Sequence, residues 1–269
     1  MKKSTSYIWN AKDYARQSAN QQKWARELIV KLNLHGNEYV LDIGCGDGKV
    51  AAEIALQLPN GIVFGIDNSS SMIELACNNF PKSQYPNLSF EINDARTFSF
   101  YPQFDLIFSN AVLHWVIDHR PVLKNIYNCL KPGGRILLQM GGKGNAADII
   151  NVLDEMRLEN KWKSYFMDFD FPYGFYGDQE YRTWLVETGF IIKRVELIPK
   201  IMTHPNKEGL EGWIRTTWLP YTQRIPNSDR DEFINEIASR YIQKQPVNSD
   251  GIIKINMMRL EVEAEKPEE

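Results

Sequence analysis

The stretch EYVLDIGCGDGK at residues 38–49 decides the fold. Its apolar side chains Val40, Leu41 and Ile43 indicate a short buried strand, and the glycines that follow indicate a tight turn. Helical spacing begins at residue 50 with VAAEIA. This order of strand, turn and helix forms one wall of a nucleotide-type pocket, because glycines let the backbone approach a ligand and a helix start has unpaired N–H groups.

The charges in this stretch separate two kinds of ligand. Asp42 ends the strand and Asp47 lies in the turn, so both carboxylates would repel a pyrophosphate. The glycines are spaced G-x-G-x-G, whereas dinucleotide-binding proteins use G-x-G-x-x-G. A ligand with an ammonium and a sulfonium suits the carboxylates better, and the glycine N–H groups can bind its own carboxylate. S-adenosylmethionine (SAM) has this charge pattern, so we predict SAM as the cofactor, bound by Asp42, Gly44, Cys45 and Gly46.

A second apolar run, GIVFGID at residues 61–67, predicts the next strand. It ends in Asp67, roughly 20 residues beyond the glycine turn, where a carboxylate accepts the ribose hydroxyls of an adenosine. Asn68 and Met72 follow and are predicted to line the adenine side. Such an acid also occurs in NAD-binding proteins, so it indicates adenosine rather than SAM itself.

Residues 104–110, FDLIFSN, predict a further buried strand. Ligands of an open parallel sheet gather at the carboxyl ends of its strands, so the residues after this strand should face the transferred group. We predict Ser109, Asn110 and Ala111 at the cofactor, with His114 and Trp115 at the acceptor. His114 is a candidate general base; a packing role is the alternative, and a carboxylate acceptor would need no base.

The apolar strands alternate with helices, which predicts an α/β fold with a doubly wound sheet. We expect strands at residues 88–95, 135–140, 191–198 and 252–263, and helices at 120–130, 178–188 and 228–243. The turn Lys131-Pro132-Gly133-Gly134 should end the helix before the fifth strand, and the last strand should pair antiparallel. Residues 261–269 are acidic and are expected to fray.

Residues 1–34 precede the first strand and are rich in aromatic and polar side chains. Helical spacing within them puts Tyr14 and Ser18 on one face. Two interpretations stay open: a helix that packs on the sheet, or a lid in which Trp9, Tyr14 and Ser18 cover the cofactor. The chain as a whole, 1–269, is expected to be a single domain. Its aromatic-rich segments 141–180 and 205–245 are expected to form a helical cap over the substrate, with loop packing as the alternative.

Composition limits the partners of this 269-residue chain. A net charge of -3 offers no basic surface for DNA or RNA. Cys45, Cys77 and Cys129 are unclustered, so we expect reduced thiols and a cytoplasmic location. The four histidines lack ligand spacing, so no metal is expected. No run approaches the roughly 20 apolar residues of a membrane span. We therefore expect a small-molecule acceptor, with no nucleic acid and no membrane, and a monomer is favoured.

Four motifs together resemble a known family: LDIGCGDG at 41–48, GIDNSSSM at 65–72, FDLIFSNAVLHWVIDH at 104–119 and GWIRTTWLPY at 212–221. They resemble the class I SAM-dependent methyltransferases, and most closely the trans-aconitate methyltransferase group. The resemblance runs from Trp9 almost to the C-terminus. Trans-aconitate enzymes read L-Q-W where this chain reads L-H-W at 113–115.

The resemblance implies a Rossmann-like seven-stranded, mostly parallel sheet with one antiparallel strand. It also implies transfer of the SAM methyl group to an oxygen of a small acid, leaving S-adenosylhomocysteine. Asn93, Asp94 and Ala95 would then bind adenine, with Asp94 accepting from its amino group; an Asx turn is the alternative. For a carboxylate acceptor, Arg215 is our leading candidate cation, with Arg224 behind it. A surface ion pair is the alternative for either arginine.

Other functions stay open at this point. A malonyl-carrier thioester or another small metabolite is an alternative acceptor. From other classes, a nicotinamide-dependent oxidoreductase and a non-catalytic SAM-binding protein are the alternatives. Asp42 and Asp47 disfavour the oxidoreductase, because both would face its pyrophosphate.

Overall fold

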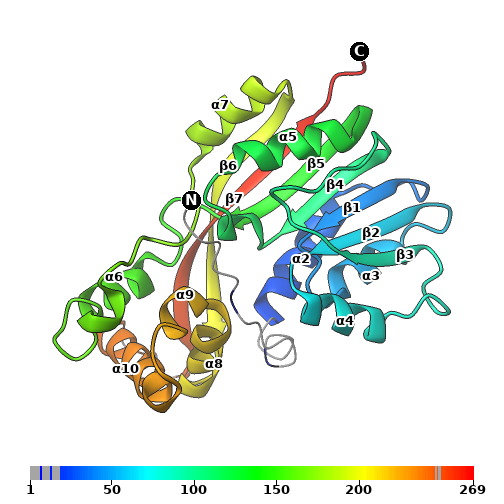
Figure 1. Cartoon of the computed structure of the whole chain (residues 1–269). Coiled ribbons are helices and arrows are strands. Elements are labelled where there is room, and N and C mark those ends of the chain that lie inside the picture. Colours follow the sequence, from blue (N-terminus) through cyan, green and yellow to red (C-terminus); the bar gives the residue numbers. More distant parts are fainter. Residues whose placement is uncertain (1–6, 8–12, 14–18, 246, 248–249) are drawn as a thin grey trace. The chain divides into compact units, whose positions relative to one another are not determined.

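A computed structural model describes residues 7, 13, 19–245, 247 and 250–269 (Figure 1). The chain divides into two compact units. The sheet unit comprises Gln21–Asn145, Tyr173–Pro199 and Met258–Glu269. The helical unit comprises Ala146–Pro172 and Lys200–Met257, together with the described part of the first 20 residues. The assignment of 1–269 to one domain with a lid and cap stays a prediction. Trp9, Tyr14 and Ser18 lie outside the described residues.

The sheet has seven strands in the order β3-β2-β1-β4-β5-β7-β6 (Figure 1). Neighbours β1 to β5 pair in parallel, and β7 pairs antiparallel with β5. This confirms the predicted α/β class. The strands are β1 (Tyr39–Ile43), β2 (Ile62–Asp67), β3 (Leu88–Ile92), β4 (Phe104–Asn110), β5 (Leu130–Gly141), β6 (Ile191–His204) and β7 (Ile253–Glu265).

Helices follow the strands in the doubly wound manner, because each parallel crossover needs a connection of a dozen residues or more. The sheet unit holds α2 (Ala19–Lys31, whose first residues belong to the other unit), α3 (Lys49–Ala55), α4 (Ser70–Asn79), η1 (Leu113–Trp115), α5 (Arg120–Cys129) and α7 (Asp178–Thr188). The helical unit holds α6 (Ala147–Met156), η2 (Lys163–Phe166), α8 (Lys207–Thr217), α9 (Leu219–Thr222) and α10 (Asn227–Lys244). None of the helices among the described residues is both long and apolar enough to cross a membrane.

Two buried clusters cover the two faces of the sheet, because side chains alternate along each strand. Leu41, Ile43 and Ile107 pack with residues of α5 and α7 on one face. Val40 and Leu106 pack with residues of α2 and α3 on the other. The carboxyl ends of β1 and β4 are thereby held side by side, which positions the loops that follow them.

The fifth strand starts earlier than predicted. Residues 131–134 were expected to form a turn, but β5 begins at Leu130 and shifts register between its pairings with Phe104 and Leu106. The extra residues keep hydrogen-bonding partners, since Lys266 N–H donates to the Gly134 carbonyl at 2.8 Å. The expected fraying of residues 261–265 was wrong for the same reason: β7 continues to Glu265 alongside β5.

Candidate functional site

The glycine turn between β1 and α3 leaves one open stretch of backbone. Gly44, Gly46 and Gly48 all have positive φ, between 53° and 82°. A Cβ at Gly44 would lie 2.2 Å from Val112 Cγ2, so protein already fills that side. A Cβ at Gly46 would meet nothing within 4 Å. Gly46 is therefore the point of the turn at which a ligand can approach the backbone.

Asp67, at the end of β2, is tied to this turn. Its Oδ2 accepts from Gly46 N–H at 3.1 Å, and its Oδ1 accepts from Ser69 N–H at 2.9 Å. Burial raises the pKa of the carboxyl, while these hydrogen bonds oppose the rise. Each carboxylate oxygen has a further lone pair, so the group can still accept two ribose hydroxyls. Beside it, Asn68 is exposed and Met72 is buried in α4.

Asp42, at the end of β1, is a buried carboxylate whose Oδ2 has no hydrogen-bond partner in the described part of the chain. Only 2% of the residue is exposed. Burial, and then the charge of Asp67, raise its pKa to about 7. A carboxylate in this position is stabilised by any cation that binds beside it. The ammonium or sulfonium of SAM would supply that cation.

Asp47 contributes less than the sequence indicated. Its Oδ2 lies 2.7 Å from Lys49 Nζ, so a neighbouring cation already offsets its charge. The electrostatic argument against a pyrophosphate therefore depends on Asp42. Cys45 is buried, and burial followed by the charge of Asp42 raises the pKa of its thiol. Its side chain is a neutral filler, so only its backbone remains as a predicted ligand contact.

Asp94 forms a local turn after β3. It accepts from Arg96 N–H at 2.8 Å and from Arg96 Nε at 2.9 Å, and this arginine is the main cause of its lowered pKa. The Asx-type turn considered from the sequence is thus present. Asn93 N–H donates to the Asp67 carbonyl at 3.0 Å, which joins this loop to the ribose candidate. Contacts of Asn93, Asp94 and Ala95 with adenine stay a prediction.

The end of β4 turns sharply. Ser109 is fully buried, and its Oγ donates to the Ile43 carbonyl at 2.8 Å, which binds β4 to β1. Asn110 is half-buried. Ala111 has a φ of 60°, a conformation that costs an L-residue about 1–2 kcal/mol, and its N–H donates to the Gln139 carbonyl at 2.8 Å. Strained backbone of this kind concentrates at functional sites.

His114 follows in η1 and is 7% exposed. Its Nδ1 accepts a hydrogen bond from Gly141 N–H at 3.3 Å. Its ring lies among Trp115, Tyr173 and Phe175, with centroids 5.7, 6.2 and 5.8 Å away. Burial is the main cause that holds its pKa well below the ordinary value. Nδ1, the one nitrogen of the neutral ring with a lone pair, already accepts from Gly141 N–H, and burial opposes protonation, which argues against the predicted general base.

Arg215 lies in the helical unit and has an acidic partner. Its Nε and Nη2 donate to Asp13 at 2.8 and 3.2 Å. The ion-pair alternative is therefore present, and a role in binding the acceptor stays a prediction. Arg224 donates to the carbonyls of Tyr165 and Asp168 at 3.3 and 3.4 Å, so it is also engaged.

The buried polar atoms of the helical unit without a hydrogen-bond partner among the described residues include His204 Nε2, Trp213 Nε1 and the Tyr221 hydroxyl. Burial lowers the pKa of His204 to about 4. Trp213 and Tyr221 lie in the motif GWIRTTWLPY that the sequence singled out. Nothing in the sequence indicated His204, because a single histidine at the end of a strand is no signal of a site.

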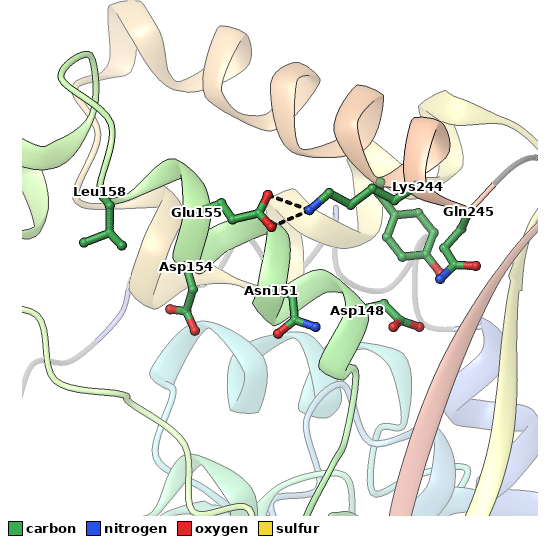
Figure 2. Close-up of a pocket in the computed structure, with 8 residues that line it drawn as sticks. Asp148, Asn151, Asp154, Glu155, Leu158, Lys244 and Gln245 are labelled. Atoms are coloured by element: carbon green, nitrogen blue, oxygen red, sulfur yellow. Dashed lines mark hydrogen bonds and ion pairs between the residues drawn. The ribbon is translucent and has the colours of Figure 1, made fainter.

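The helical unit also has a surface hollow of about 370 Å³ beside α6 and α10 (Figure 2). Its carboxylates have partners: Glu155 lies 2.5 Å from Lys244 Nζ, Asp154 lies 2.7 Å from Arg157 Nε, and Asp148 accepts from the Asn256 amide at 3.1 Å. No glycine turn or unpartnered acid among the described residues lines it. The two features that suit a cofactor, the open turn at Gly46 and the unpartnered Asp42 carboxylate, lie in the sheet unit instead. Among the described residues, no three His, Cys, Asp or Glu side chains could hold a metal ion.

The chain is similar to known methyltransferases. A family model described as "Methyltransferase domain" matches residues 34–189. A trans-aconitate 2-methyltransferase of Variovorax paradoxus is 28% identical over 269 residues, covering 96% of this chain and 98% of the relative.

Two solved structures illustrate the shared fold. The YcgJ protein of Bacillus subtilis has a TM-score of 0.63 and 19% identity, covering 92% of this chain and 100% of its own. A phosphoethanolamine N-methyltransferase 2 of Haemonchus contortus, in complex with phosphomonomethylethanolamine and S-adenosylhomocysteine, has a TM-score of 0.60 and 21% identity. It covers 96% of this chain and 57% of its own.

Proposed function

Since the chain belongs to the methyltransferase-domain family and is a SAM-dependent methyltransferase, we propose that it methylates a carboxylate oxygen of a small-molecule acid. The resemblance to class I SAM-dependent methyltransferases is confirmed, and SAM replaces the nicotinamide alternative. Trans-aconitate is the acid in the name of the Variovorax paradoxus relative, so it is the first acceptor to test.

The observation that carries this proposal is that the lone pair of His114 is occupied by Gly141 N–H. A hydroxyl acceptor must lose a proton as it is methylated, which calls for a base. The His114 Nδ1 already accepts from Gly141 N–H, and burial opposes protonation of the ring. A carboxylic acid has an ordinary pKa near 4, so at neutral pH it arrives as a nucleophile with no proton to remove. This site therefore suits an acid.

Positioning supplies the rest of the catalysis. Holding an acceptor oxygen in line with the sulfonium methyl can lower the barrier by roughly 7–11 kcal/mol. We assign the ribose to Asp67 and the cationic methionyl end to Asp42. The N–H groups of Gly44 and Cys45 donate to the Ile66 carbonyl at 2.7 and 3.0 Å, and that of Gly46 donates to Asp67, so these donors are already engaged. We propose that the backbone of the turn contacts the cofactor through its open face at Gly46. Further cofactor contacts are proposed for Tyr14, Ser18, Asn68, Met72, Asn93, Asp94, Ala95, Ser109, Asn110 and Ala111.

A panel of acceptors tests the proposal. The purified chain is incubated with methyl-labelled SAM and trans-aconitate, citrate, a malonyl-carrier thioester, a phenol or an amine. Labelled methyl ester and S-adenosylhomocysteine are expected from at least one acid, and none from its methyl ester or amide. Turnover confined to hydroxyl or amine acceptors would refute the assignment to carboxylates.

A further inference from the structure

The backbone fixes the protonation state and orientation of His114. A peptide N–H can only donate, so the hydrogen bond from Gly141 N–H to Nδ1 places a lone pair on that nitrogen. The single proton of the neutral ring therefore lies on Nε2. The His114 carbonyl in turn accepts from Gly174 N–H at 2.9 Å, which holds the residue in place from the other side. Both anchors are main-chain groups.

The proton on Nε2 has no acceptor in the described part of the chain. The neighbours of the ring are the aromatic side chains of Trp115, Tyr173 and Phe175. Phe175 can lie there because residue 141 is glycine, where a Cβ would come within 2.6 Å of Phe175 Cε1. The residue is 93% buried, and a donor without a partner beside these aromatic rings is a group that a ligand oxygen would satisfy.

The buried guanidinium of Arg259 exerts an electrostatic effect on the His114 ring. Arg259 lies on β7 directly opposite Gly141, and it is 3% exposed. Its guanidinium carbon lies 5.5 Å from the centroid of the Trp24 ring. After burial, its positive charge is the next largest cause of the low pKa of His114. A positive potential at the donor attracts an anionic acceptor and repels an ammonium.

Another titratable neighbour of His114, besides Tyr173 and Arg259, is His119, which is itself buried. Its Nδ1 is hydrogen-bonded to the Tyr181 hydroxyl, and its Nε2 lies 2.9 Å from the Val116 carbonyl. Burial lowers the pKa of His119 to about 4, so it stays neutral in the range where the enzyme would be assayed.

We propose that His114 is a fixed hydrogen-bond donor whose Nε2–H holds the reacting carboxylate of the acceptor, while the Arg259 guanidinium balances the charge of that carboxylate. This inference rests on the proposed function and names the residues that select an acid. One carboxylate oxygen forms a bond to the methyl carbon as the carbon–sulfur bond breaks, and the bonding pair goes to sulfur. The carboxylate and the sulfonium lose their charges together, and no proton moves.

Variants of His114 separate a donor from a base. Glutamine keeps a donor near the position of Nε2 but cannot act as a base, and phenylalanine keeps only the ring. We expect kcat/KM with trans-aconitate, or with the best acid of the panel, to stay within about fivefold for His114→Gln. It should fall about 100-fold for His114→Phe, the loss typical of one charge-stabilising donor. For the wild type and His114→Gln, kcat should be level between about pH 6.5 and 9.

Loss of activity in His114→Gln as deep as in His114→Phe, with an acid limb in the wild-type profile, would instead identify a base. Arg259→Lys retains the charge but loses the planar fork, and we expect KM for the acid to rise roughly tenfold with kcat little changed. Arg26→Gln is the control, since Arg26 is 64% exposed and pairs with Glu53. Calorimetry with SAM and thermal melts verify that each variant is folded.

If Arg259→Lys does not fold, the wild type still tests the cation. The acid should then compete at least tenfold better than its amide for the complex with S-adenosylhomocysteine. Equal binding overturns the role of Arg259. Methylation of acids with unaltered kinetics in both Arg259→Lys and His114→Phe refutes this inference alone. A wild type that binds no acid and methylates only other acceptors overturns the proposed function as well.

Discussion

Asp42 offers the sharpest test of the cofactor assignment, because its carboxyl has a pKa of about 7 in the cofactor-free protein. Burial is the main cause, and the charge of Asp67 is the second. A bound ammonium or sulfonium stabilises the carboxylate and draws its pKa back toward the ordinary value near 4. Below about pH 7, SAM binding must therefore expel a proton from Asp42.

The size of the effect follows from this linkage. The Kd for SAM should rise about tenfold between pH 8 and pH 6, equivalent to about 1.4 kcal/mol. Isothermal titration calorimetry at pH 7, in two buffers of different ionisation enthalpy, should show about half a proton released per SAM. Asp42→Asn should bind SAM more weakly and without this pH dependence. Glu53→Gln, which alters a partly exposed acid paired with Arg26, should keep it.

As pH rises, the stability of the cofactor-free protein should change in the opposite direction to its affinity for SAM. The native pKa of Asp42 lies above its unfolded value, so the native state holds a proton between about pH 4 and 7 that the unfolded state has lost. The free energy of unfolding without cofactor therefore falls as pH rises through this window, by as much as about 4 kcal/mol. Asp42→Asn should unfold at a higher temperature than the wild type at pH 8. A Kd that is the same at pH 6 and pH 8, or a lower Tm for Asp42→Asn at pH 8, would refute this account.

Three further substitutions test single contacts of the structure. Asp67→Ala should leave the fold intact but raise the Kd for SAM more than 100-fold, on the order of 3 kcal/mol, as the ribose acceptor is lost; retained affinity in calorimetry means that the ribose assignment is wrong. Gly46→Val should cost about 1–2 kcal/mol in chemical denaturation because of its positive φ, yet weaken SAM binding far more, since the new side chain enters the open space; equal losses in both assays argue against a ligand there. Tyr221→Phe should leave stability unchanged or raise it by about 1 kcal/mol, because its buried hydroxyl has no partner in the described chain; a drop of more than about 1 kcal/mol points to an unrecognised acceptor.

The parts of the fold that the sequence predicted are those with local causes. The glycine turn, the acids that end β1 and β2, and the alternation of apolar strands with helices all act within a few residues. The start of β5 could not be predicted from its neighbours in sequence. Lys266 stabilises that segment by donating from its Nζ to the carbonyls of Tyr127 and Leu130, both at 2.9 Å, from about half the chain away in sequence.

The same difference between local and long-range causes applies to the site residues. The Lys49 partner of Asp47 is two residues away and was available to the sequence, whereas the Asp13 partner of Arg215 is 202 residues away and was not. His114 shows the limit most clearly. Its residue type is compatible with a base, and only the contact with Gly141, 27 residues on, assigns its proton. The sequence contained only a weak indication that Arg259 could have a role, since it is a single arginine in the strand IKINMMRLEVEAE.

The proposed reaction pairs two charges, and the sheet unit has a group that would attract each of them. Asp42 is a buried acid that a cation would relieve, while the Nε2 donor of His114 lies within the field of Arg259 and favours an anion. Methyl transfer from a sulfonium to a carboxylate removes both charges in one step, so neither product retains the interaction that held its precursor. The methyl ester is neutral and would no longer be attracted by Arg259, and the neutral thioether sulfur would no longer be attracted by Asp42. The site would therefore bind the two substrates more tightly than the two products. No protein group would have to gain or lose a proton in each cycle.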